Sequence, residues 1–283
     1  MALPKQIEIE VVTATDLSPK YLQCASEFIR FWLLIGRDSE YLFRPKVFVV
    51  CKSIPDSLDT VSEYCQVVSL DHVHSAFTAQ NIRTIEAGNS LADFVVTTDI
   101  DMFPLSLQSF TPAIEALSRD NDLFVVLRDV LEPGQYPICY NVASPDTWKT
   151  VMLDGEDIAL EDRLLQLLDR YGGKAAYDGI HGGDGWHIDQ MDLYKRVSQN
   201  IDSNRLITFT DAITKHRRLD RAHHRFPLNW LILPLVVFGY FSDYHVHHPI
   251  HRYRRYIKAL YSALRIRMAF PALNNRGHKR DKK

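Results

Sequence analysis

The first half of the chain alternates short apolar runs with segments that carry the apolar spacing of helices. Apolar runs predict strands at residues 7–12, 45–51, 66–70, 94–96 and 123–127. Helical spacing predicts helices at residues 21–35, 56–64, 75–91 and 107–118. Alternating strands and helices are typical of a mainly parallel sheet covered by helices on both faces, so the predicted fold class is α/β.

The second half is less regular. It predicts strands at residues 138–143 and 206–209, helices at residues 158–171 and up to Val197, and a short helix that Asp146 would cap. Residues 178–185 form a loop rich in Gly, His and Asp. This loop lacks both the GxxxxGK[ST] pattern of P-loops and the GxGxxG pattern of dinucleotide-binding folds. Its glycines are interpreted as allowing the backbone to pass close to a sugar or a neighbouring strand.

Composition narrows the class of protein. The chain has 283 residues, 46% hydrophobic and 24% charged, with a net charge of -2, which is ordinary for a globular protein and argues against a nucleic-acid partner. The four cysteines have no CxxC spacing and are expected to be reduced. No signal peptide is recognised, and the longest apolar run, residues 230–241, contains Pro234 and is too short to span a bilayer. The expected location is therefore the cytoplasm.

The most informative motif is Asp99-Ile100-Asp101, which follows the apolar run at residues 94–96. Residues i and i+2 of a strand share one face, so Asp99 and Asp101 can converge on one point. Paired carboxylates are hard oxygen ligands suited to Mg²⁺ or Mn²⁺ carrying a diphosphate. The alternative is an ordinary strand-to-loop transition, where Asp is common.

The order of elements resembles the GT-A glycosyltransferases, in which a nucleotide-binding α/β half precedes a D-x-D metal motif and an acceptor-binding half. Asp99 and Asp101 match the D-x-D position, the pair Asp189-Gln190 matches a second feature about 90 residues later, and His245 matches a late metal-ligand histidine. The resemblance covers residues 7–252. It implies a Rossmann-like mixed sheet flanked by helices, with a catalytic domain at residues 1–251 whose halves meet near residue 130.

The resemblance also implies the chemistry of the site. Asp99 and Asp101 would anchor Mn²⁺ or Mg²⁺, or else the ribose of the donor, and His245 would complete the coordination of the ion. The ion would neutralise the leaving diphosphate of a nucleotide-sugar donor. Asp189 would be the catalytic carboxylate, acting as general base or contacting the sugar, or else it simply caps a helix.

Further residues are candidates for binding the two substrates. Arg83 lies on the helix before the metal motif, where it would bind the donor or be a solvated surface residue. Arg218 and Arg221 belong to a basic cluster that would close over the donor. The alternatives are a solvated loop or an ion-pair network around Asp220. The other candidates are Thr13, Thr15 and Ile100 for the donor, and Asn141, Asp184 and Trp186 for the acceptor, with Trp186 stacking on a sugar or serving as a core anchor.

Residues 252–283 form a basic segment in which Tyr256, Leu260 and Leu264 follow helical spacing. A basic amphipathic helix is typical of peripheral contact with an anionic membrane, here at its inner face. The alternative is that the apolar stripe packs on the catalytic domain.

The predicted function is transfer of a sugar to a glycan or lipid-linked saccharide, as in polysaccharide biosynthesis. Two alternatives remain. A sugar-phosphate nucleotidyltransferase normally carries a Gly-rich, basic loop after its first strand, and residues 13–17 contain neither Gly nor Arg. A non-catalytic membrane-associated scaffold on a degenerate transferase fold is disfavoured because Asp99, Asp101 and Asp189 are intact.

Overall fold

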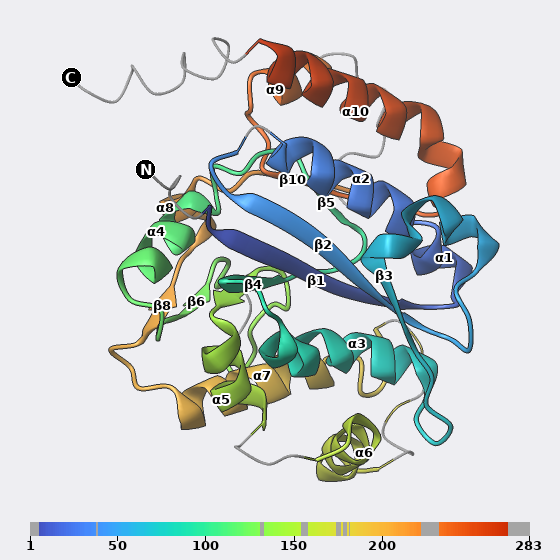
Figure 1. The fold of residues 1–283 in the computed structure, drawn as a ribbon, viewed down its shortest axis with the longest axis vertical. Coiled ribbons are helices and arrows are strands. Elements are labelled where there is room, and N and C mark those ends of the chain that lie inside the picture. The colour runs from blue at the N-terminus through green and yellow to red at the C-terminus, as the bar shows by residue number, and fades with distance from the viewer. Residues whose placement is uncertain are drawn as a thin grey trace.

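The computed structural model describes residues 6–37, 39–130, 133–153, 158–173, 177, 180, 182–221 and 232–270 (Figure 1). Within these residues a seven-stranded sheet runs in the order β3-β2-β1-β4-β7-β6-β8. Its strands are β1 (Glu8–Asp16), β2 (Leu42–Val50), β3 (Cys65–Val68), β4 (Phe94–Thr97), β6 (Phe124–Val126), β7 (Asn141–Ala143) and β8 (Leu206–Thr208). The predicted α/β class is confirmed.

The sheet is mixed in direction. The first four strands in space, β3, β2, β1 and β4, are parallel, whereas β7 runs antiparallel to both β4 and β6. Parallel neighbours need a long crossover. Helices lie in the connection from β1 to its neighbour β2 and in the connection from β3 to β4, which is the other parallel neighbour of β1. No helix lies in the described residues between β6 and β7, and an antiparallel pair can form without one.

Helices cover both faces of the sheet, as Figure 1 shows. These helices are α2 (Ala25–Gly36), α3 (Ser75–Ile85), α4 (Thr111–Arg119), α5 (Pro145–Leu153), α6 (Leu160–Arg170) and α7 (Ile188–Asn200). Successive strand residues face opposite sides, so Val11 lies in the core shared with α2 and α4, and Val12 in the core shared with α3, α5 and α7. Shorter elements are α1 (Pro19–Leu22), α8 (Asp211–Thr214), α9 (Ile232–Val237) and the 3₁₀ turns Asp56–Tyr64, Glu86–Asn89 and Ile250–Tyr253.

Two local predictions are corrected. The helix predicted over residues 21–35 is broken between α1 and α2, at Gln23 and Cys24. Helix α5 is capped by Ser144 and not by Asp146, because the Thr147 backbone N–H donates to the Ser144 hydroxyl at 3.2 Å. Asp146 already lies inside the first turn of that helix.

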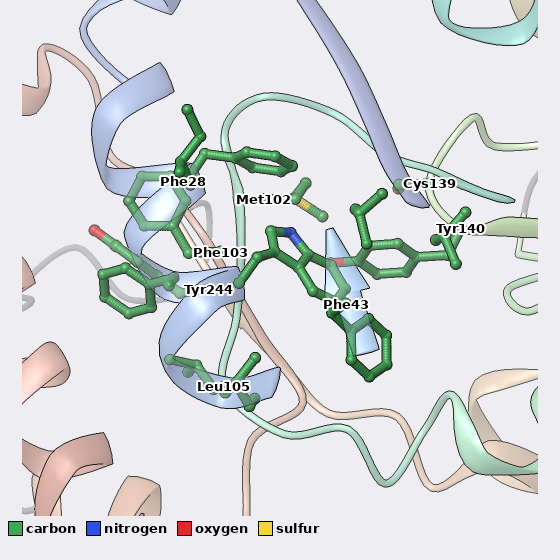
Figure 2. Close-up of a cluster of buried hydrophobic side chains, with 14 of the residues drawn as sticks. Phe28, Phe43, Met102, Phe103, Leu105, Cys139, Tyr140 and Tyr244 are labelled. Atoms are coloured by element: carbon green, nitrogen blue, oxygen red, sulfur yellow. The ribbon is translucent and has the colours of Figure 1, made fainter. Parts of the chain in front are cut away.

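A second, three-stranded sheet was not predicted. It has the order β5-β10-β9, formed by β5 (Met102–Pro104), β10 (Asp243–His245) and β9 (Arg218–Asp220). Phe103 of β5 stacks on Phe31 with ring centroids 5.0 Å apart and meets Tyr244 of β10 at 6.3 Å. Figure 2 shows Phe103 and Tyr244 beside Phe28 in this core. The small sheet is therefore packed against α2 and brings the last third of the chain to the residues that follow β4.

The basic C-terminal helix α10 (Arg254–Ala269) packs on the domain. Tyr256, Leu260 and Leu264 are buried in the same core as α2, and Tyr261 contacts Phe31 with ring centroids 5.5 Å apart. Of the two alternatives for the apolar stripe, packing on the rest of the chain is the one observed. The predicted tail after Phe270 lies outside the described residues, and among the described helices none is long and apolar enough to cross a bilayer.

Candidate functional site

A cavity of about 310 Å³ opens where β1 and β4 end. These strands are parallel, so their carboxyl ends meet at one edge of the sheet, where open α/β folds bind ligands. Strand β1 contributes Thr15 and Asp16, α3 contributes Gln80 and Arg83, and α7 contributes Asp189. The remaining lining residues are Ala14, Tyr21, Ala76, Ala79, Asp99, Ile100, Asp101, Trp186, Gln190, Arg221 and His245.

The Asp99-Ile100-Asp101 motif forms the turn between β4 and β5. The Met102 backbone N–H donates to the Asp99 carbonyl at 3.1 Å and closes this turn. The two carboxylates line the same cavity but have different partners. Asp99 accepts a hydrogen bond from Arg83, and Asp101 accepts one from Arg221 at 2.8 Å. The side chain of Asp99 remains 37% exposed, so it is the more accessible of the two.

Arg83 is buried between two carboxylates. Its Nη1 donates to Asp99 and its Nη2 donates to Asp189 at 3.0 Å. Its Nε donates to the Gln80 carbonyl at 3.0 Å and its Nη1 also donates to the Thr98 carbonyl at 3.1 Å. The alternative of a solvated surface arginine is therefore wrong. Arg83 instead joins the D-x-D turn to α7.

Asp189 lies in the first turn of α7, where the N-cap residue is His187. Its Oδ1 accepts from the Gln190 backbone N–H at 2.9 Å, and its Oδ2 accepts from Arg83. Burial raises the pKa of the Asp189 carboxyl to about 6, against the opposing effect of the Arg83 charge, and Asp99 raises it further. A carboxyl whose pKa is near neutrality can exchange a proton under physiological conditions.

Asp101 is the centre of a second charged group. His248 Nε2 lies 3.2 Å and His245 Nε2 lies 3.5 Å from Asp101 Oδ2. Burial alone would raise the pKa of the Asp101 carboxyl, but hydrogen bonds from the two histidines and the charge of Arg221 hold it well below its ordinary value. Burial lowers the pKa of His245, but the bond to Asp101 outweighs it and the net shift is upward.

A cross-strand pair in the small sheet positions His245. Strands β9 and β10 are parallel, with Arg218 opposite Asp243 and Asp220 opposite His245. His245 Nδ1 lies 3.2 Å from Asp220 Oδ2.

Arg218 donates to Asp243 at 2.9 Å through Nη2, and Asp243 is buried. Arg218 does not line the cavity, so its predicted role in donor binding is not supported. Its guanidinium is already committed to a buried carboxylate.

The predicted metal ligands agree with this geometry in part. In the part of the chain that the structure describes, no group of three or more His, Cys, Asp or Glu side chains is arranged to hold a metal ion. Asp101 and His245 nevertheless lie 3.5 Å apart, close to the separation of about 3 Å between adjacent ligands of one Mg²⁺ ion. Asp99 lines the same cavity, where its carboxylate is paired with Arg83. Carboxylate oxygens and an imidazole nitrogen are donor types that bind Mg²⁺ and Mn²⁺, so the residue types present fit a divalent ion.

Other predicted residues divide into two sets. Thr15, Ile100 and Trp186 line the cavity, whereas Thr13, Asn141 and Asp184 do not. Asn141 is buried in β7, where its side-chain amide donates to the Pro137 and Ile138 carbonyls at 2.7 and 3.0 Å. That amide holds the preceding turn, which argues against acceptor binding. Thr13 is buried inside β1, and Asp184 is exposed outside the cavity.

Sequence reasoning missed several neighbours of the site. Tyr21 and Gln80 line the cavity, and His248 binds Asp101. Gln80 lies three residues before Arg83, on the same helix face, and that spacing is the one signal that could have identified it. Lys20 lies beside the site: burial lowers the pKa of its ammonium, the nearby Arg221 lowers it further, and Asp101 raises it.

Comparison with known proteins gives matches in structure alone. No family model and no curated protein matches the chain. The glycosyltransferase GlyE of Streptococcus pneumoniae is similar at 13% identity and a TM-score of 0.48, over 94% of this chain and 64% of that chain. The chain thus spans less than two thirds of the length of GlyE.

For two further solved structures, the aligned region covers most of this chain and most of the other protein. The galactosyltransferase LgtC, solved with donor and acceptor sugar analogs, matches at 10% identity and a TM-score of 0.44, over 89% of this chain and 95% of that chain. Mouse xyloside xylosyltransferase 1 matches at 9% identity and a TM-score of 0.43, over 86% and 98%. These similar structures are glycosyltransferases, the class that the sequence resemblance implied. At such identities and TM-scores they do not transfer an activity to this chain.

Proposed function

We propose that this chain is a metal-dependent glycosyltransferase of the GT-A type, which moves a sugar from a nucleotide-sugar donor to a glycan or lipid-linked saccharide. The main support is one cavity that gathers the carboxylates of Asp99, Asp101 and Asp189 with the guanidinium groups of Arg83 and Arg221. It lies at the carboxyl ends of parallel strands, where a nucleotide would bind. Transfer to an acceptor needs this combination: positive charge for a leaving diphosphate and a carboxylate near the sugar.

Asp99, Asp101 and His245 are the residues that would hold Mn²⁺ or Mg²⁺. The bound ion would supply positive charge against the diphosphate as the bond to the sugar breaks. Asp99 would then exchange its bond to Arg83, and one N–H of that guanidinium would become available to the donor. Arg83 would keep its bond to Asp189 and so hold that carboxylate toward the same substrate. Arg221 and Lys20 would add positive charge beside Asp101.

Asp189 is the proposed catalytic residue. It is buried, is oriented by Arg83, and has a pKa raised by burial to about 6. If the reaction inverts the anomeric centre, Asp189 takes the proton of the acceptor hydroxyl as that oxygen attacks the sugar. If the reaction retains it, the carboxylate contacts the positively charged sugar. Trp186, which also lines the cavity, offers a flat indole surface for stacking on a sugar ring.

The proposal is tested with a panel of UDP-, GDP- and TDP-linked sugars. We expect one of them to be hydrolysed and to raise the melting temperature with Mn²⁺ or Mg²⁺ but much less with EDTA. Asp101→Ala should abolish hydrolysis in a folded protein, while Asp59→Ala, at an exposed residue of the 3₁₀ turn Asp56–Tyr64, should leave it unchanged. Equal stabilisation in EDTA would contradict the metal, and an inactive panel would contradict the transferase.

We also propose reversible contact with an anionic membrane at its cytoplasmic face. Arg254, Arg255, Lys258 and Arg265 are exposed on α10, opposite its buried stripe, so the contact would be electrostatic. Full-length protein should co-sediment with vesicles containing phosphatidylserine at low salt and be released as salt screens the charges. No binding at low salt would contradict this part of the proposal.

A further inference from the structure

Large apolar side chains are exposed where α9 meets the C-terminal end of α10. Phe238, which follows α9, is 56% exposed, and Ile266 and Phe270 at the end of α10 are 50% and 60% exposed. We call the whole set the apolar patch, and it consists of Leu235, Phe238, Tyr240, Ile266 and Phe270. Single exposed apolar side chains are ordinary, but several that gather in one place indicate a surface that binds a partner.

Two observations place these side chains together. Ile266 and Phe270 lie on one face of α10, since the Phe270 backbone N–H still donates to the Ile266 carbonyl at 3.2 Å. The turn after α9 packs against the same end of α10, because a Cβ atom at Gly239 would lie 2.9 Å from the Arg267 guanidinium. Phe238 precedes Gly239 and so lies beside the last turn of α10. Figure 1 shows α9 next to this end of α10.

The surroundings of the apolar patch carry positive charge. Residues 232–270 contain one acidic residue, Asp243, and it is buried in its pair with Arg218. The Arg217 guanidinium lies over the Tyr240 ring, 4.1 Å from its centroid. The exposed cations of α10 are Arg254, Arg255, Lys258 and Arg265. A partner that covers this surface must therefore accept apolar side chains and carry negative charge.

We propose that the apolar patch inserts into an anionic phospholipid bilayer while the cations of α10 contact the headgroups. The inference rests on the membrane contact proposed above and adds an apolar part to it. The cations from Arg254 to Arg265 extend over roughly 16 Å of α10, and a bilayer surface presents negative charge over that whole length. The hydrocarbon beneath the headgroups accepts the side chains of Phe238 and Phe270.

Insertion changes how the protein responds to salt. Salt screens the attraction between charges but does not screen the removal of apolar area from water. Wild type therefore stays bound at salt concentrations that release a variant without the apolar side chains. The apolar patch fixes one end of α10 in the bilayer, so it also sets which side of the molecule faces the membrane.

The test compares wild type with the double variant Phe238→Ser, Phe270→Ser. Both side chains are exposed, so the double variant should unfold in urea close to the wild-type midpoint. Co-sedimentation uses vesicles of phosphatidylserine with phosphatidylcholine at rising sodium chloride. We expect the double variant to bind about tenfold more weakly at low salt and to be released at lower salt. Leu91→Ser, at an exposed residue outside the apolar patch, is the matched control and should bind as wild type does.

A second measurement reports insertion directly. Phe238→Trp places an indole in the apolar patch, and Leu91→Trp places one outside it. Lipids brominated on their acyl chains quench indoles that reach the hydrocarbon. Relative to wild type, we expect additional quenching for Phe238→Trp and none for Leu91→Trp.

Three outcomes would overturn the inference. If the double variant binds as wild type does and Phe238→Trp shows no additional quenching, the contact is electrostatic alone. If wild type does not bind the vesicles at low salt, the membrane contact fails as a whole. If sedimentation velocity shows a wild-type dimer that the double variant dissociates, a second copy of the chain covers the apolar patch. Hydrolysis of the nucleotide sugar in solution tests the transferase separately, and the double variant should hydrolyse it as wild type does.

Discussion

The buried pair of Arg218 and Asp243 gives the sharpest test of the structure against the sequence. Sequence reasoning placed Arg218 on the donor diphosphate, whereas the structure places it against Asp243. The Asp243 side chain is 1% exposed and that of Arg218 is 16% exposed. Asp243 also accepts from the Tyr140 hydroxyl at 3.0 Å and lies 3.2 Å from His216 Nε2. We predict that Asp243→Asn destabilises the protein strongly.

The size of the effect follows from burial. Removing one partner of a buried ion pair leaves the other charge uncompensated and typically costs about 3–5 kcal/mol. For a chain of this length, each kcal/mol lowers the melting temperature by roughly 2–4 °C, so a loss of about 6–20 °C is expected. The double variant Arg218→Met, Asp243→Leu should recover most of that loss, because neither charge of the pair then remains buried without its partner.

The pH dependence has a definite sign. Burial opposes ionisation of Asp243, but the charge of Arg218 outweighs it, so the pKa of this carboxyl lies well below its ordinary value of 3.8. A carboxyl whose pKa is lower in the folded than in the unfolded protein stabilises the fold at pH values above its unfolded-state pKa. The advantage of wild type over Asp243→Asn should be complete at neutral pH and shrink as pH falls below about 4.

Urea denaturation of the single and double variants provides the measurement, together with the affinity of Arg218→Met for the nucleoside diphosphate. A small stability change in Asp243→Asn, with a tenfold or greater loss of nucleoside diphosphate affinity in a stable Arg218→Met, would refute the structural role. It would return Arg218 to the donor site.

The remaining predictions concern Asp189 and α10. Asp189→Asn should lower turnover by roughly 10²–10⁴ if the carboxylate is the base. Because the pKa of Asp189 is raised to about 6 in the folded protein, its ionisation opposes folding. Wild type should therefore lose about 2 kcal/mol of stability relative to Asp189→Asn between pH 4 and pH 7 in urea titrations. Normal turnover of Asp189→Asn, with the same pH dependence of stability in both proteins, would contradict both roles. Leu260→Ala, at a fully buried position of α10, should lower the free energy of unfolding by about 2–5 kcal/mol. The control Lys258→Ala, on the exposed face of α10, should change the unfolding midpoint little. Equally small effects of both substitutions would mean that α10 does not belong to the core.

The sequence by itself determined the α/β class and the place of the site. Strand periodicity is local, since each residue needs only its near neighbours to show which face is apolar. The run at residues 94–96 is buried in β4 as predicted, and Asp99 and Asp101 follow it at the sheet edge where ligands bind. Asp189, His245 and Arg221 were identified from motif and order along the chain, and the structure brings them to the same cavity.

Contacts between distant segments were decided by the tertiary structure alone. The small sheet pairs β5 with β10, which lies about 140 residues later, and three-residue strands carry too little periodic signal to be recognised. Arg83 and Arg218 show the same limit. From the sequence, either side chain fits a solvated cation or a ligand-binding cation. In the structure, each guanidinium is paired with a buried carboxylate from elsewhere in the chain: Asp189 for Arg83, and Asp243 for Arg218. The apolar stripe of α10 equally fits a membrane or a protein core, and in the folded chain it packs into the core that contains α2. An amphipathic pattern specifies that a face must be buried, and only the assembled fold specifies against what.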